Sequence, residues 1–292
     1  FTTHVWATSD TSDIERKQPA HWSHLPIWGD KARELGYELP IPVGFNIYYN
    51  KQSVAYDAKD NFNLGLTGSG WLHNVNANVV IPADDVIITG EDESIQLRAD
   101  AWVLPFLNLY GVIGHTKGSS VANVQLEADW SSILPPAACL ISPCLGVSDP
   151  FDFELNFIGT TYGVGGTLVG GIGNWFALLD VNYTNTDLDI LDGEISSIVV
   201  SPRAGYRTSY NQRDIQVWVG AMYQNVEQTF SGYLRDIGIP LGNAKFEVNQ
   251  HLEDKWNGLL GGQVGITKNI DLLLELGFGT RTSFMMGLGY RF

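Results

Sequence analysis

The C-terminal segment alternates bulky apolar residues with small or charged ones at a period of two. From Ser283 to Phe292 the even positions carry Phe, Met, Leu or Tyr, whereas the odd positions carry small residues, one methionine and Arg291. Successive side chains of a β-strand point to opposite faces. The pattern therefore predicts a closing strand with one apolar face.

The same alternation recurs in most of the chain upstream. Apolar residues fill one face of each segment, and polar residues or glycines fill the other. The alternating segments cover residues 95–103, about 154–170, 175–184, 197–207, 215–224, 260–266 and 270–279. Short connections at 105, 171–173, 209–213 and 267–269 alternate with longer ones at 58–93, 131–153, 187–194 and 234–244. Such segments predict an antiparallel up-and-down sheet.

A half-apolar sheet in water needs a second layer to cover it, and the sequence offers almost no amphipathic helix for that role. Lipid is the simpler cover, and a closed sheet leaves no unpaired edge in the hydrocarbon. We therefore predict an all-β fold, a closed antiparallel up-and-down transmembrane β-barrel over residues 41–292, with periplasmic tight turns and extracellular long loops. Aromatic residues on the apolar faces near strand ends are expected to form an interfacial girdle: Trp175, Tyr183, Tyr206, Tyr223, Tyr290 and Phe292.

The number of strands depends on residues 58–93. As one long loop this region gives ten strands, and with a hairpin around Phe62–Leu66 and Asn76–Ile81 it gives twelve. We favour twelve, because a structureless loop of that length is uncommon. Residues 1–40 do not share the alternation and form a separate N-terminal arm, which could plug the lumen, lie at the inner leaflet or hang in the periplasm.

Composition supports an exported membrane protein. Hydrophobic residues make up 44% of the 292 and charged residues 17%, below the roughly 25% charged share of a soluble domain, yet no apolar run is long enough for a membrane helix. The formal charge of −15 argues against nucleic acid as a partner. Acidic loops could face lipopolysaccharide or simply be solvated. The start at Phe1, without Met, indicates a chain whose export signal has been removed.

Two cysteines, Cys139 and Cys144, lie close together in a proline-containing loop. This spacing fits a local disulfide in an oxidising compartment. Acidic residues near 187–194 and 84–93 could gather Ca²⁺, but the EF-hand spacing is missing and such loops are usually solvated. We therefore predict no metal and no cofactor.

Polar residues collect on the faces expected to point inward, and they carry charges of both signs. The predicted pore-lining residues are Arg98, Asp100, Asn108, Asp180, Asn182, Arg203, Arg207, Gln216, Gln263 and Glu275. Two interpretations remain open. These residues either line a narrow water-filled path and set its ion preference, or pair with one another and fill a barrel too small to conduct.

An enzyme is the competing class, namely a barrel hydrolase that acts on lipid or peptide. Hydrolysis needs a nucleophile beside a positioned histidine and an orienting acid. His115 with Ser119 or Ser120 is the best candidate, and it is a weak one, since a lone histidine at a strand end is more often a girdle or loop residue. We predict no catalytic residue. A third hypothesis, suggested by the acidic loops, is a non-conducting adhesion or structural barrel.

The ending Gly287-Leu288-Gly289-Tyr290-Arg291-Phe292 resembles the closing strand that Gram-negative outer-membrane barrels present to their assembly machinery. The stretch from Leu97 to Gly114 and the chain length resemble small outer-membrane channels associated with the meta-pathway of phenol degradation. That resemblance implies passage of small, rather hydrophobic or aromatic molecules, but no functional residue of the family has a match here. We therefore expect a passive diffusion channel in the outer membrane, in contact with lipid and lipopolysaccharide.

Overall fold

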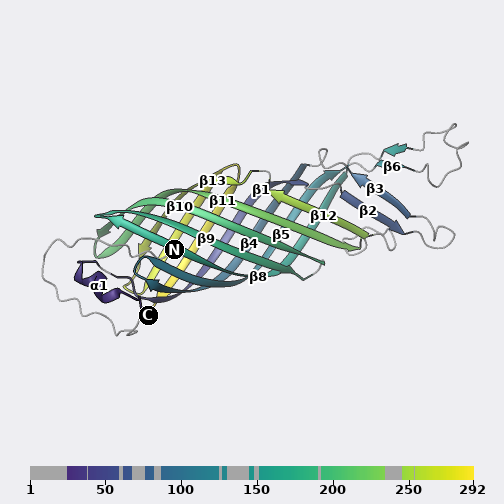
Figure 1. Ribbon diagram of the computed structural model, residues 1–292. Helices are drawn as coiled ribbons and strands as arrows, with labels where there is room; N and C mark the ends of the chain where they lie inside the picture. Colours follow the sequence, from purple (N-terminus) through teal and green to yellow (C-terminus); the bar gives the residue numbers. More distant parts are fainter. Residues whose placement is uncertain are drawn as a thin grey trace, which may run out of the picture.

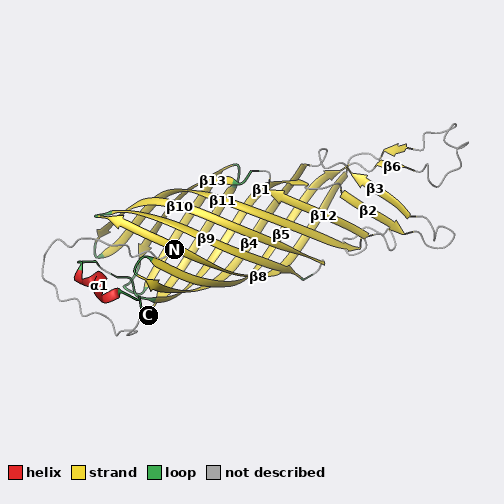
Figure 2. Cartoon of the chain, viewed as in Figure 1, coloured by secondary structure: helices red, strands yellow, loops and turns green. Residues whose placement is uncertain are grey.

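The structure, a computed structural model, describes residues 25–37, 39–58, 62–67, 76–81, 87–124, 127–129, 145–147, 151–189, 192–233, 245–252 and 254–292. Almost all of this is β-strand (Figure 2). The elements are α1 (Gly29–Glu34), β1 (Val43–Ala58), β2 (Phe62–Thr67), β3 (Asn76–Ile81), β4 (Ile87–Leu104), β5 (Leu107–Val124), β6 (Glu127–Asp129), β7 (Leu145–Val147), β8 (Phe151–Ile172), β9 (Trp175–Leu188), β10 (Asp192–Tyr210), β11 (Arg213–Tyr233), β12 (Lys245–Leu252), β13 (Trp256–Gly265), β14 (Ile270–Gly279) and β15 (Thr282–Arg291). Among the described residues, no helix is both long and apolar enough to cross a membrane.

Ten strands close into one antiparallel ring (Figure 1). Around the ring they follow the order β1, β4, β5, β8, β9, β10, β11, β13, β14 and β15. The last strand, β15, pairs with the first, β1, from Gly44 opposite Arg291 to Ser53 opposite Thr282. The predicted closed antiparallel barrel is confirmed, and the ring holds ten strands, so the favoured count of twelve was wrong.

The hairpin expected within residues 58–93 does form, but it lies outside the ring. Strands β2 and β3 pair with each other, and β2 pairs with β12 instead of joining the barrel wall. Strand β1 pairs directly with β4 along fifteen positions, from Val43 to Asp57. Alternation identifies a strand but does not identify its neighbours, which is why the count failed.

Tight turns gather at the end of the barrel that also holds the C-terminus and α1 (Figure 1). They lie at residues 105–106, 173–174, 211–212 and 266–269. In the turn between β10 and β11, Asn211 and Gln212 have φ of 51° and 61°, the positive values that a two-residue hairpin of this twist requires. The connection expected to be long at 187–194 is short, because β9 runs to Leu188 and β10 starts at Asp192.

The outer face of the barrel is apolar next to the tight turns. Val217, Val219, Leu274 and Leu276 are 45–62% exposed there. Aromatic rings pair at the tight-turn end, where Trp175 contacts Tyr206, and the centroids of Tyr290 and Phe292 lie 6.1 Å apart. Farther along, the rings of Tyr223 and Trp256 meet at 5.3 Å. Two aromatic bands flanking an apolar belt are the arrangement expected of a wall in lipid.

Beyond the second aromatic band the outer face becomes charged. Lys117 forms an ion pair with Glu93 at 2.9 Å, and Lys51 approaches Glu91 at 3.7 Å. All four side chains lie on the outer faces of β1, β4 and β5. Exposed ion pairs are suited to water and not to hydrocarbon. The long strands therefore extend past the apolar belt.

The number of strands in the barrel wall decreases from the tight-turn end to the other end. Strands β13, β14 and β15 have ten residues each, whereas β11 has 21. Past the tip of the β14–β15 hairpin, β12 pairs with β11 on one side and with β1 on the other. The ring there consists of eight strands: β1, β4, β5, β8, β9, β10, β11 and β12. Because barrel diameter grows with strand number, the barrel narrows at this point.

The N-terminal segment meets the barrel at the tight-turn end. The backbone N–H of Ile27 donates to the carbonyl of Val103 at 2.8 Å, and α1 follows directly. Residues 1–24 lie outside the described residues, so the domain boundary at residue 40 and the plug stay predictions. Cys139 and Cys144 lie outside them too, and their disulfide also stays a prediction.

Candidate functional site

The predicted pore-lining residues all belong to inward-facing positions of ring strands. Eight of the ten are buried, at 0–8% exposure, and Asn182 and Arg207 are partly buried. Since alternate positions of these strands are exposed on the outer face, the buried polar residues between them point into the lumen. Most of them engage one another, so the charges of both signs are largely neutralised within the barrel.

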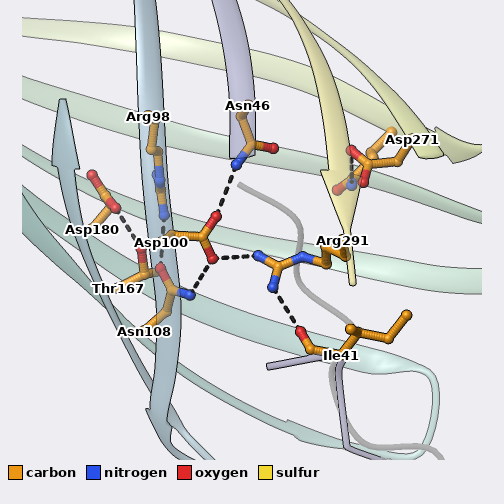
Figure 3. Close-up of polar contacts among 10 residues, drawn as sticks. Ile41, Asn46, Arg98, Asp100, Asn108, Thr167, Asp180, Asp271 and Arg291 are labelled. Carbon is orange, nitrogen blue, oxygen red and sulfur yellow. Dashed lines mark hydrogen bonds and ion pairs between the residues drawn. The ribbon is translucent and has the colours of Figure 1, made fainter. Parts of the chain in front are cut away.

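Asp100 is the centre of one polar cluster near the tight-turn end (Figure 3). Its carboxylate accepts hydrogen bonds from Asn46 Nδ2 at 2.8 Å, from Asn108 Nδ2 at 2.6 Å and from Arg291 Nη2 at 2.5 Å. Arg291 Nη1 also donates to the carbonyl of Ile41 at 2.8 Å. The buried ion pair thus has several further partners, which is the condition under which such a pair is tolerated.

Asp180 is the centre of a second cluster, and it is fully buried. Tyr110 donates to its carboxylate at 2.8 Å and Thr167 at 2.6 Å, and Asn182 lies at 3.4 Å. The guanidinium of Arg98 stacks 3.5 Å from the centre of the Tyr110 ring. This cluster joins strands β4, β5, β8 and β9 on the inside of the wall.

A third group crosses the lumen. Arg203 on β10 donates through Nε and Nη2 to both carboxylate oxygens of Glu275 on β14, at 2.7 and 2.8 Å. The indole N–H of Trp218 on β11 donates to the same carboxylate at 2.7 Å. A bidentate pair with an additional donor fixes these side chains firmly.

Apolar side chains close the lumen at the tight-turn end. They form one buried cluster of Trp102, Val169, Phe176, Leu178, Trp218 and Leu273. Trp102 on β4 and Trp218 on β11 come from opposite sides of the ten-stranded ring. The cluster therefore spans the barrel from wall to wall.

The eight-stranded section is also filled by side chains. Phe157 and Phe230 pack there at a tilt, with ring centroids 5.4 Å apart, and both are 0–2% exposed. Gln228 Nε2 donates to the hydroxyl of Tyr56 at 3.1 Å across the same section. An eight-stranded barrel is just wide enough for side chains to fill, so this packing is expected.

Between these two filled sections lies a cavity of about 260 Å³. Its wall includes five of the predicted residues, Arg98, Asp180, Asn182, Arg203 and Glu275. Apolar side chains form much of the remaining wall, among them Phe157, Ile195 and Val226. Its lining includes Arg281 from the β14–β15 connection and also Tyr56 and Gln228 from the eight-stranded section. The cavity therefore lies at the step from ten strands to eight. It is the best candidate for a functional site among the described residues.

Sequence reasoning missed several residues of this cavity. Arg281 lies in the two-residue connection between β14 and β15, where no alternation indicates a direction. Asp92 belongs to a region interpreted as loop, yet it is inward on β4 and accepts hydrogen bonds from Tyr56 and Gln52. Extending the alternation of β4 backwards from Gln96 would have assigned Asp92 to the inner face.

The hydrolase candidates are not brought together. His115 is on the outer face of β5, whereas Ser120 is inward and contacts Gln250 at 3.3–3.4 Å. Ser119 shares the outer face with His115, but no acid is bonded to that histidine in the described part of the chain. Within those residues there is also no group of three or more His, Cys, Asp or Glu side chains arranged to hold a metal ion.

No protein-family model matches this chain, and no curated protein matches it in sequence. Among solved structures it is similar to the outer membrane protein OprG from Pseudomonas aeruginosa, with 14% identity, 87% of this chain and 99% of that chain covered, and a TM-score of 0.37. It is similar also to an outer membrane channel from Pseudomonas putida F1, with 11% identity, coverage of 87% and 96%, and a TM-score of 0.34. At identities and TM-scores this low, neither residue roles nor substrates can be transferred to this chain.

The geometry of the wall indicates the kind of surroundings that it suits. The ring is closed, its outer belt is apolar and two aromatic bands flank that belt. Only helices and closed barrels satisfy every backbone group within lipid. The chain is a closed antiparallel β-barrel whose apolar outer belt suits contact with membrane lipid.

Proposed function

We propose that this chain is a passive outer-membrane channel through which small solutes diffuse. The observation that carries the proposal is the cavity of about 260 Å³ at the step from ten strands to eight, with a wall of charged, polar and apolar groups. A barrel whose interior served only as a packed core would leave no such space. Fixed polar groups of both signs around a water-sized path are the usual means of selecting solutes in a pore.

The filled sections on either side limit what passes. Trp102 and Trp218 close the tight-turn side, and Phe157 and Phe230 close the far side. A solute must displace these side chains, so flux is expected to be low and confined to small molecules. Aromatic and aliphatic walls favour solutes with an apolar body, in line with the resemblance to channels of phenol degradation.

The remaining expected partners belong to the same proposal. Strand β15 offers its apolar outer face, from Phe284 to Tyr290, to the barrel-assembly machinery. The charged outer faces beyond the second aromatic band, with Lys51 and Lys117, suit contact with lipopolysaccharide. A hydrolase is not proposed, because His115 faces outward.

Reconstituted protein tests the channel. Proteoliposomes would be assayed by swelling in neutral solutes of increasing size, with planar bilayers for ion conductance. We expect slow flux with a sharp size limit for the natural chain and faster flux for Trp102→Ala, because this substitution opens the cluster that spans the tight-turn end. Leu274→Ala, a truncation on the lipid-facing side of β14, is the matched control and should leave flux unchanged.

A chain lacking residues 1–40 tests the predicted plug in the same assay. Faster flux after the deletion would assign the constriction to the arm. The channel proposal fails if the natural chain, Trp102→Ala and the deletion all give neither swelling nor conductance while folding normally, and a non-conducting structural barrel would then replace it.

A further inference from the structure

Arg281 occupies an unusual position for a charged turn residue. It forms the tip of the β14–β15 hairpin, yet it is only 3% exposed, because β12 bridges β11 and β1 beyond the tip and encloses it within the wall. Its side chain lines the cavity together with Tyr56, Asp92 and Gln228. A side chain that ordinarily reaches into water has thus been turned into the lumen.

The guanidinium of Arg281 has no partner at its ends. Among the described residues, neither Nη1 nor Nη2 donates to any acceptor, whereas the Arg281 backbone N–H donates to Asn257 Oδ1 at 3.4 Å. Asp92, on the same cavity wall, is already bonded to Tyr56 at 2.8 Å and Gln52 at 3.0 Å. A guanidinium remains charged under all ordinary conditions. Asp254 is an acidic neighbour whose charge acts on Arg281, but among the described residues no carboxylate is bonded to Nη1 or Nη2. Burying these two nitrogens without a bonded partner is costly, so the arrangement favours an anion.

The residues around Arg281 indicate which other chemical groups a ligand of this cavity would carry. Gln228 Oε1 also lacks a partner within the described residues and can accept a hydrogen bond from a polar group. The same cavity wall also contains apolar residues, among them Phe157, Ile195 and Val226. The volume of about 260 Å³ lies just below the roughly 300 Å³ at which pockets for drug-sized ligands begin. The site therefore suits a small molecule with one anionic end and an apolar body.

We propose that the cavity binds a small organic carboxylate of about the size of benzoate, with the carboxylate on Nη1 and Nη2 of Arg281 and the apolar body against Phe157 and Val226. A guanidinium matches a carboxylate through two parallel hydrogen bonds. The formal charge of −15 would repel anions at long range, so the preference comes from this one group and not from the overall field. That such a carboxylate passes through the barrel rests on the proposed channel function. That it binds in the cavity depends on the cavity alone.

Calorimetric titration of the full-length protein in detergent tests the site with benzoate and with benzyl alcohol, which has a similar shape and no charge. We expect benzoate to bind one site per chain, and benzyl alcohol to bind at least about tenfold more weakly. Arg281→Gln should weaken benzoate about ten- to a hundredfold, as expected for loss of hydrogen bonds to a charged group, and should leave benzyl alcohol unchanged. Arg281→Lys keeps the charge but cannot form two parallel hydrogen bonds, so its affinity for benzoate should lie between those of the natural chain and Arg281→Gln. Arg213→Gln, at an exposed turn arginine, is the matched control.

Equal binding of benzoate by Arg281→Gln and by the natural chain, or no binding of benzoate by the natural chain, would overturn the inference. Folding of each variant is checked by circular dichroism and by the heat-dependent shift of barrels on gels. If Arg281→Gln does not fold, the natural chain still decides, because equal affinity for benzoate and benzyl alcohol contradicts the proposal. Swelling separates the two hypotheses. Flux of neutral solutes without benzoate binding would support the channel and contradict the binding site. Saturable benzoate binding without any flux would support the binding site and contradict the channel.

Discussion

Two arginines on the last hairpin have the same burial and opposite surroundings. Arg291, at the end of β15, is 2% exposed and reaches both the carboxylate of Asp100 and the carbonyl of Ile41. Arg281, ten residues earlier, is 3% exposed, and its two terminal nitrogens reach no partner in the part of the chain that the structure describes. A buried charge with a full set of partners serves the fold, whereas one without them points to something that binds.

The difference follows from where each arginine lies along the barrel. Arg291 is at the tight-turn end, where the Asp100 cluster and the apolar cluster around Trp102 fill a ten-stranded ring. Arg281 lies where β14 and β15 stop and the ring falls to eight strands. The wide section continues up to that step, and the side chains that fill the narrow section begin beyond it. A cavity remains between, and Arg281 faces it.

Removing Arg291 should have the largest effect. Arg291→Met leaves the Asp100 carboxylate buried without its counter-ion, and loss of one partner of a buried pair typically costs about 3–5 kcal/mol. The measurement is urea unfolding of protein folded into phosphatidylcholine vesicles, followed by tryptophan fluorescence. Arg213→Met, at an exposed turn position, is the control and should change the free energy of unfolding by less than about 0.5 kcal/mol. A loss for Arg291→Met no greater than that of the control would show that the pair is unimportant for the fold.

Removing Arg281 should act in the opposite direction. Arg281→Met deletes a buried charge whose Nη1 and Nη2 have no hydrogen-bond partner among the described residues, and an unsatisfied buried group costs about 1–3 kcal/mol. The free energy of unfolding should therefore rise by about that amount in the same assay, without bound anion. Addition of benzoate should stabilise the natural chain and leave Arg281→Met unaffected, because a ligand that binds only the folded state adds stability. A variant less stable than the natural chain in the absence of anion would mean that Arg281 has a structural role.

The faces of the strands follow from the sequence alone. Along β15 every even position from Phe284 to Tyr290 points outward and Arg291 points inward, because a period of two fixes both faces once one of them is apolar. The same rule placed Asp180 and Arg203 on inner faces. That solute passes these residues stays a prediction.

The neighbours of each strand do not follow from the sequence. The alternation in β12 resembles that of a ring strand, but β12 ends at Leu252 and pairs with β1 as well as β11. Contacts across the lumen, such as that between Arg203 and Glu275, depend on how far strands are staggered. Arg281 was missed for the same reason, since a turn residue becomes buried only through the distant strand that covers it.

Asp180 is a third buried charged residue, and its carboxylate is bonded by neutral donors. Changing these donors should have the smallest effect on the free energy of unfolding. Thr167→Val removes the donor at 2.6 Å and should lower the free energy of unfolding by about 1 kcal/mol, the typical net contribution of one hydrogen bond. Asn182→Ala removes the contact at 3.4 Å, which is near the limit of hydrogen bonding, so it should cost less than Thr167→Val. Both are measured by the same urea titration. If Asn182→Ala costs more, the contact at 3.4 Å matters more for the fold than its length indicates; if the order holds, the short hydrogen bond from Thr167 is the main support of the Asp180 carboxylate.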